Sequence, residues 1–153
     1  MTLQGSIGLS MVPPGPPDSY LGVAFAVVKA VRVLADTRPT PSIPLAMLAA
    51  HCLECALKAY LSKDGSDAIV RGVNVRHDLG ALWSMAQVAG LAVAAPPPAW
   101  VLMLGDVHGA PYYLRYLTGV HGLSLPPAEP MATELEAVLQ LVRRGIRGGP
   151  AEA

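Results

Sequence analysis

The sequence predicts an all-α protein, a four- to five-helix up-and-down bundle. Apolar residues recur at helical spacing in several segments that Pro- or Gly-rich turns separate. The chain has 153 residues, of which 52% are hydrophobic and 14% charged, so it can build one domain around one core. The stretch Leu45 to Leu61, LAMLAAHCLECALKAYL, contains no Gly or Pro and is apolar on nearly every face. Such a segment is typical of a buried central helix.

Turn and capping residues set the bounds of the other helices. The helices are expected at residues 18–34, from 45 to near Gly65, and at residues 78–90, 99–117 and 129–147. Asp18 or Ser19 is expected to cap the first helix, although its valines leave a strand as the minority alternative. Asp78 is expected to cap the third. Pro111 has no N–H for the helical ladder, so a kink or a restart is predicted inside the fourth.

The domain organisation is predicted to be simple. Residues 1–17 are expected to form a flexible Pro/Gly-rich tail, residues 18–147 the bundle, and residues 148–153 a flexible C-terminal tail. No signal peptide and no clean apolar stretch of about 20 residues is recognised, so neither a membrane span nor a membrane partner is expected. Arg is more frequent than Lys, and the Ala, Gly and Pro content suggests a GC-rich bacterial genome. A cytoplasmic location is the expectation.

The apolar sequence of the central helix contains three polar residues, namely His51, Glu54 and Lys58. Their spacing places them on one stripe of the helix. Because unpaired buried polar groups are costly, the stripe is expected to meet partners. Glu54 and Lys58 also form an i, i+4 pair in the favourable order, which favours a structural role over an active site. A ligand-binding role for the stripe is the alternative.

Cys52 and Cys55 form a C-x-x-C pair inside the same helix. A redox role expects this pair at the start of a helix, and a zinc site needs two further soft ligands that the sequence does not offer. Buried free thiols are therefore favoured. Neither a metal site nor a cofactor is predicted.

Two further segments carry reactive side chains. In the segment RGVNVRHDL, His77 is either an acid/base group, alone or paired with Arg71, or a loop residue that hydrogen-bonds the central helix through Glu54. The second interpretation is favoured. In the segment DVHGAPYYLRYLTGVH, aromatic residues alternate with Arg, a pattern typical of nucleotide or RNA stacking and also of dimer interfaces. The reactive side chains of this second segment are His108, Tyr112, Tyr113, Arg115, Tyr116 and His121.

The motifs HCLECALKAYL, HDLGALW and LRY together resemble the HEPN superfamily of small bacterial and archaeal helical bundles, over roughly residues 18–147. The resemblance implies a four- or five-helix bundle with two long antiparallel helices and frequent homodimerisation. Catalytic members are metal-independent ribonucleases with an Arg-x4-6-His motif, which Arg71 to His77 and Arg115 to His121 both fit. Other members are binding or partner modules, often beside a separately encoded nucleotidyltransferase. Tyr116 stands where a polar residue commonly follows the motif's Arg.

The leading hypothesis is a homodimeric HEPN-like bundle that acts as a nucleotide- or RNA-interacting module, of the kind found as a toxin–antitoxin component. A net charge of zero gives no general attraction to nucleic acid, so a local site must supply the binding. One alternative is an active metal-independent endoribonuclease in which Arg115 binds phosphate and His121 is the general acid/base. Another is a ligand-free helical protein–protein interaction module. The expected ligand-binding residues are His51, Glu54, Lys58, His77, His108, Tyr112 and Arg115.

Overall fold

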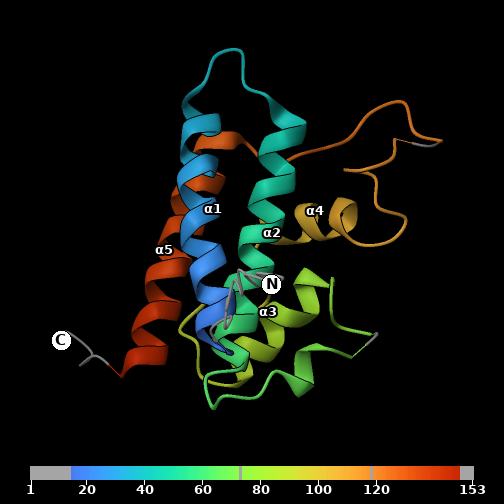
Figure 1. Cartoon of the computed structure of the whole chain (residues 1–153). Helices are drawn as coiled ribbons and strands as arrows, with labels where there is room; N and C mark the ends of the chain where they lie inside the picture. The colour runs from blue at the N-terminus through green and yellow to red at the C-terminus, as the bar shows by residue number, and fades with distance from the viewer. Residues whose placement is uncertain (1–14, 73, 118, 149–153) are drawn as a thin grey trace, which may run out of the picture.

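The structure is a computed structural model that describes residues 15–72, 74–117 and 119–148. Within these ranges it is all-helical and contains no strand, which confirms the predicted fold class and rules out a strand for the first helix (Figure 1). The predicted tails lie outside the described residues apart from residues 15–17 and 148. The elements are α1 (Asp18–Asp36), α2 (Ser42–Leu61), the 3-10 helix η1 (Ala68–Val70), α3 (Leu79–Val88), α4 (Ala99–His108) and α5 (Ala128–Arg147).

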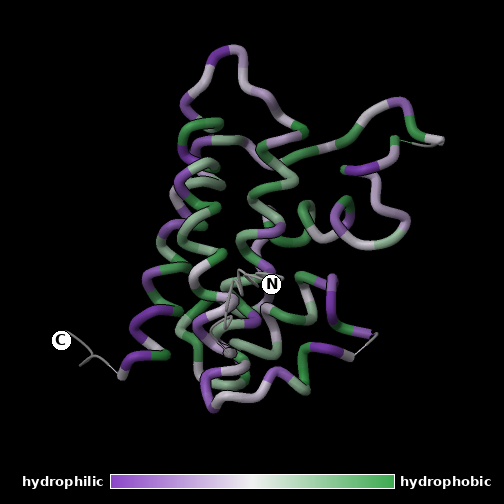
Figure 2. The backbone as a smooth tube through the Cα atoms, in the orientation of Figure 1, coloured by the Kyte–Doolittle hydropathy of each residue, from purple (hydrophilic) through white to green (hydrophobic). Residues whose placement is uncertain are grey.

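The centre of the bundle is α2. It contacts α1, α3, α4, α5 and η1, and every residue from Cys52 to Leu61 is buried. The three long helices α1, α2 and α5 run side by side, while the short helices α3 and α4 lie on the other side of α2 (Figure 1). In α5, hydrophobic and hydrophilic residues alternate along the helix, as the green and purple bands of Figure 2 show. The predicted central helix is thereby confirmed, but it ends at Leu61 rather than near Gly65, with Ser62 as its C-cap.

Only one of the two predicted N-caps is present in the structure. Asp78 caps α3, because its Oδ1 accepts a hydrogen bond of 2.9 Å from the backbone N–H of Ala81. Pro17 occupies the N-cap of α1, so the predicted cap by Asp18 or Ser19 is wrong, and both lie inside the helix.

The fourth helix is shorter than predicted. It ends at His108, and the described residues of the segment that follows form turns and irregular backbone up to α5. The expected restart toward Leu117 does not occur. Gly109 is extended, with a φ of −73° and a ψ of −180°, and Pro111 has no N–H to resume the ladder.

Close packing and an ion-pair group join the long helices. A Cβ on Gly145 of α5 would lie 2.6 Å from Cε2 of Tyr60 in α2, so only Gly allows this approach. On the outer side, Arg32 of α1 donates to Glu136 at 2.6 Å and to Glu129 at 2.7 Å, both on α5. These side chains are partly exposed, so their contribution to stability is expected to be modest.

By length and composition, α2 could also cross a membrane. In this fold, 67% of its most apolar window is buried inside the bundle. The core helix of a soluble protein has the same length and composition, so this is weak evidence for a membrane span.

Candidate functional site

The strongest candidate site is centred on the carboxylate of Glu54, whose side chain is only 8% exposed. Its Oε1 accepts a hydrogen bond of 2.6 Å from Nζ of Lys58, one turn further along α2. Its Oε2 lies 2.5 Å from Nε2 of His108. Nδ1 of His77 lies 3.2 Å from Oε1 and 3.3 Å from Oε2. We call these four residues the Glu54 cluster.

The members of the Glu54 cluster come from three parts of the chain. Glu54 and Lys58 face the same way because they are four residues apart in α2. His77 directly precedes the capping residue Asp78 of α3, and His108 is the last residue of α4. The two imidazole rings meet edge to face, with their centroids 5.9 Å apart. The packing of α3 and α4 against α2 therefore assembles the cluster.

The surroundings of Glu54 keep it ionised. Burial raises its pKa, but hydrogen bonds from His108, Lys58 and His77, together with the charge of Lys58, lower it further, and the result is a pKa of about 2. A carboxylate can only accept hydrogen bonds, so the nitrogen of each imidazole that faces Glu54 is the one that carries a proton. The second nitrogen of His77 is then left for another partner.

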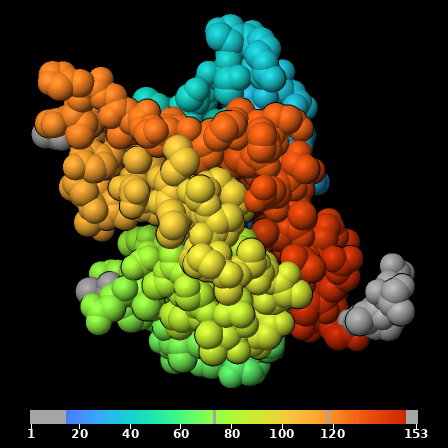
Figure 3. Space-filling model, turned by 180° about the vertical axis from the view of Figure 1, so that it is seen from behind, coloured from blue at the N-terminus to red at the C-terminus, as the bar shows by residue number. Residues whose placement is uncertain are grey.

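A cavity of about 580 Å³ opens beside His77. Its lining residues come from α3, α4 and the segments that flank them. The helices α3 and α4 pack against each other, on the face of the molecule that Figure 3 shows. The lining of the cavity mixes charged, polar and small residues, which are Asn74, Arg76, His77, Asp78, Gly80, Leu102, Gly105, Asp106, Gly109, Ala110 and Tyr112. A volume of this size suits a small ligand.

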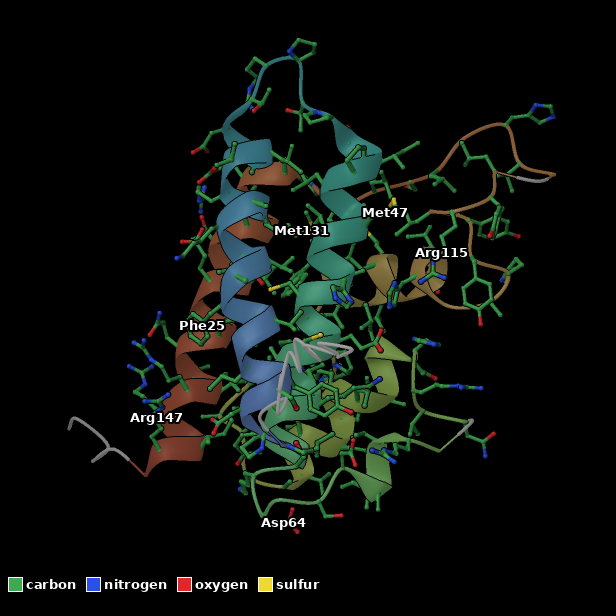
Figure 4. The ribbon with its side chains drawn as sticks, viewed as in Figure 1. Phe25, Met47, Asp64, Arg115, Met131 and Arg147 are labelled. Atoms are coloured by element: carbon green, nitrogen blue, oxygen red, sulfur yellow. The ribbon has the colours of Figure 1, made fainter. Side chains whose placement is uncertain are left out.

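Tyr112 joins the cavity to the segment that follows α4. Its ring contacts the ring of His77 edge to face at 6.3 Å, and the guanidinium of Arg115 lies over it at 5.7 Å. Figure 4 places Arg115 on this segment, beyond the end of α4. Tyr112 has a φ of 64°, which is uncommon for a bulky residue and is found chiefly where the surroundings impose it.

Most of the residues predicted from the sequence meet at this place. Contacts link Glu54, Lys58, His77, His108, Tyr112 and Arg115 in one continuous chain. The predicted hydrogen bond between His77 and the central helix is present, and its partner is Glu54. The cavity residues Asn74, Arg76 and Asp106 were not predicted, and no local pattern in the sequence distinguishes them.

Other predicted residues lie apart from the Glu54 cluster. His51 is exposed, and its Nε2 lies 3.9 Å from Sγ of Cys55. His121 is exposed too, and among the described residues no hydrogen bond or ion pair joins it to Arg115. Arg71 pairs with Asp67 at 3.0 Å rather than with His77.

Both thiols are free and buried, as predicted. Burial raises the pKa of Cys52 to about 12. Burial and the nearby charge of Glu54 raise the pKa of Cys55 to about 11. Both therefore remain protonated near neutral pH, which makes them poor nucleophiles.

Comparisons of the chain with models of protein families, with curated proteins and with solved structures find no match. The resemblance to the HEPN superfamily thus rests on the short sequence motifs alone.

Proposed function

We propose that the protein is an HEPN-like helical module that binds a nucleotide, or one unstacked base of a single-stranded RNA, in the cavity beside His77. The observation that carries this proposal is the position of Tyr112. Its ring borders the cavity, contacts His77 and lies under the guanidinium of Arg115. Aromatic rings that alternate with Arg are the usual platform for an unpaired base.

The rest of the cavity offers suitable partners for a nucleotide. Arg76 lines the wall and Arg115 lies beyond Tyr112, so guanidinium groups are available for a phosphate. Asn74 and Asp106 provide an amide and a carboxylate for the edge of a base or for a ribose hydroxyl. The net charge of zero favours a short ligand over a long RNA, because affinity for a polyanion depends on many phosphate contacts.

The proposal extends to assembly. Apolar side chains are exposed on α1, α2 and α4 and on the segment after α4, which supports a homodimer. The exposed apolar residues concerned are Val23, Val33, Met47, Leu102, Tyr116 and Leu117. We further propose a cytoplasmic toxin–antitoxin-type role, with a separately encoded nucleotidyltransferase as the partner. Sedimentation velocity at micromolar concentration tests the dimer, and a species of monomer mass alone would contradict it.

Isothermal titration tests ligand binding. The probes are the common ribonucleoside 5′-monophosphates and a short single-stranded oligouridylate. We expect the wild-type chain to bind at least one of them. Tyr112→Ala should weaken that binding roughly 5- to 150-fold, because stacking of a base on an aromatic ring contributes about 1–3 kcal/mol.

Tyr116→Ala is the matched control. Tyr116 belongs to the same segment and is 64% exposed, and it does not line the cavity. Its replacement should leave the affinity unchanged within about twofold, because a side chain outside the cavity loses no contact with the ligand. Wild-type protein that binds none of the probes would instead favour a ligand-free interaction module.

A further inference from the structure

We infer that Glu54, His77 and His108 form a binding site for a divalent transition-metal ion of the zinc, cobalt or nickel type. Each residue offers one ligand atom, and these atoms all lie within 4.8 Å of one another. They come from α2, from the residue before the cap of α3, and from the end of α4. The folded bundle therefore creates the site, and no sequence motif indicates it.

The donor atoms determine which ions fit. Two imidazole nitrogens and one carboxylate oxygen form a borderline set that suits zinc, cobalt, nickel or ferrous iron. Magnesium and calcium prefer a shell of oxygens, so this set discriminates against both. Three protein ligands also leave coordination positions for water or an incoming group.

The distances allow an ion after a small adjustment, and its binding releases the imidazole protons that face Glu54, because a metal ligand must be deprotonated. Bonds of about 2.0–2.2 Å from the metal to nitrogen and oxygen place neighbouring ligand atoms roughly 3.0–3.5 Å apart. The carboxylate of Glu54 already lies 2.5 Å from His108 and 3.2–3.3 Å from His77. His77 can supply most of the movement, because it lies on the irregular segment between η1 and α3 and its side chain is 39% exposed.

Lys58 orients the carboxylate and also limits the affinity. Its Nζ donates to Oε1 of Glu54, which leaves Oε2 for the ion. The charges of Lys58 and Glu54 cancel, so the ion enters a site without net negative charge. We therefore expect micromolar binding, weaker than that of a structural zinc site.

The cavity provides access to the site. His77 lines it together with Gly109 and Tyr112, so water or a ligand oxygen can reach an ion that His77 holds. This inference rests on the Glu54 cluster alone and does not depend on nucleotide binding.

The experiment uses the tag-free, metal-free full chain, titrated with cobalt(II) chloride or zinc chloride. We expect binding of one ion per chain by calorimetry, a visible absorption band with cobalt, and a raised melting temperature, because the ion binds only the folded state. Magnesium chloride should produce none of these changes. His77→Ala and Glu54→Gln should each weaken binding roughly tenfold or more, since each removes a direct ligand.

His51→Ala and His121→Ala are the matched controls, because both histidines are exposed and lie outside the cluster. Their affinities should stay within about twofold of wild type, because a lone exposed imidazole supplies too few ligands for a site. Circular dichroism checks that each variant is folded. If Glu54→Gln unfolds, His77→Ala alone tests the site, because His77 has the most exposed side chain of the three ligands and its loss should disturb the fold least. Wild type that binds neither cobalt nor zinc, or binding that persists at wild-type strength in folded His77→Ala, would overturn the inference. Loss of nucleotide binding alone would contradict only the proposed function.

Discussion

The Glu54 cluster and the segment of residues 109–127 each contain reactive side chains that the sequence identified, but the structure holds them very differently. In the cluster, one buried carboxylate has three partners from three parts of the chain. In the segment, Arg115 and His121 are both exposed, and among the described residues no hydrogen bond or ion pair joins them. A reactive residue type is thus only a candidate until packed elements fix its position.

The same contrast predicts where substitutions matter. Inside the cluster, the removal of one group leaves others buried without partners, which is costly. In the segment, solvent replaces a lost contact, so stability should scarcely change. Experiments on the two regions can therefore sharpen or break the comparison.

The largest effect is expected from Glu54→Ala. This change leaves the buried Lys58 and two partly buried imidazoles without their common acceptor, and the loss of a partner by a buried charge costs about 3–5 kcal/mol. Urea denaturation followed by circular dichroism measures the change in the free energy of unfolding. Glu134→Ala, at an exposed carboxylate on α5, is the control and should stay within about 0.5 kcal/mol of wild type. Equal stability of both variants would show that the buried carboxylate of Glu54 contributes no more to stability than an exposed one.

Acid should weaken the cluster in a defined range of pH. The pKa of Glu54 is lowered from 4.5 to about 2 in the folded protein, so its contribution to stability is complete above pH 4.5 and is lost as the pH falls toward 2. The shift corresponds to about 3 kcal/mol. The difference in unfolding free energy between wild type and Glu54→Gln should shrink by about this amount over that range, as denaturation at several pH values can measure. A difference that does not vary with pH would show that the cluster does not hold the carboxylate in its charged form.

A smaller effect is expected from Gly145→Ala, which tests the packing that holds α2 in place. The new Cβ would lie 2.6 Å from the ring of Tyr60, so Tyr60 or α5 must shift, at a cost of about 1–3 kcal/mol that better helix propensity offsets only in part. Gly22→Ala in α1 is the matched control, because its Cβ meets nothing within 4 Å. Gly22→Ala should stabilise the protein by up to about 1 kcal/mol, and thermal melting of both variants measures the difference.

The parts of this structure that follow from local rules were predictable from the sequence. Apolar periodicity gave the central helix, the i, i+4 spacing gave the pair of Glu54 and Lys58, and the position of Asp78 before an apolar run gave its cap. The interruption of the helix near Gly109 and Pro111 was predicted, but its end at His108 was not. Gly and Pro indicate an interruption without deciding whether the helix resumes.

The long-range part of the site was not predictable. His108 and Glu54 are 54 residues apart and meet because α4 packs against α2. Nothing in the local sequence encodes that crossing, so the spacing of Glu54, His77 and His108 along the chain does not reveal that their side chains meet. Arg76 and Asp106 line the cavity for the same reason.

The smallest effect on stability is expected from the exposed segment, where Arg115→Ala and His121→Ala should each change the free energy of unfolding by less than about 0.5 kcal/mol. Their effects on function should differ from each other. Arg115 lies over the ring of Tyr112, so its loss should weaken nucleotide binding, whereas His121→Ala should bind like wild type. A general acid/base must lie within hydrogen-bond reach of the group it serves, and no described contact holds His121 beside Arg115. Purified wild-type protein is therefore expected to leave a generic RNA intact in the presence of EDTA. Cleavage under these conditions, with 2′,3′-cyclic phosphate ends and abolished by either substitution, would place the active site in the segment and reverse the comparison.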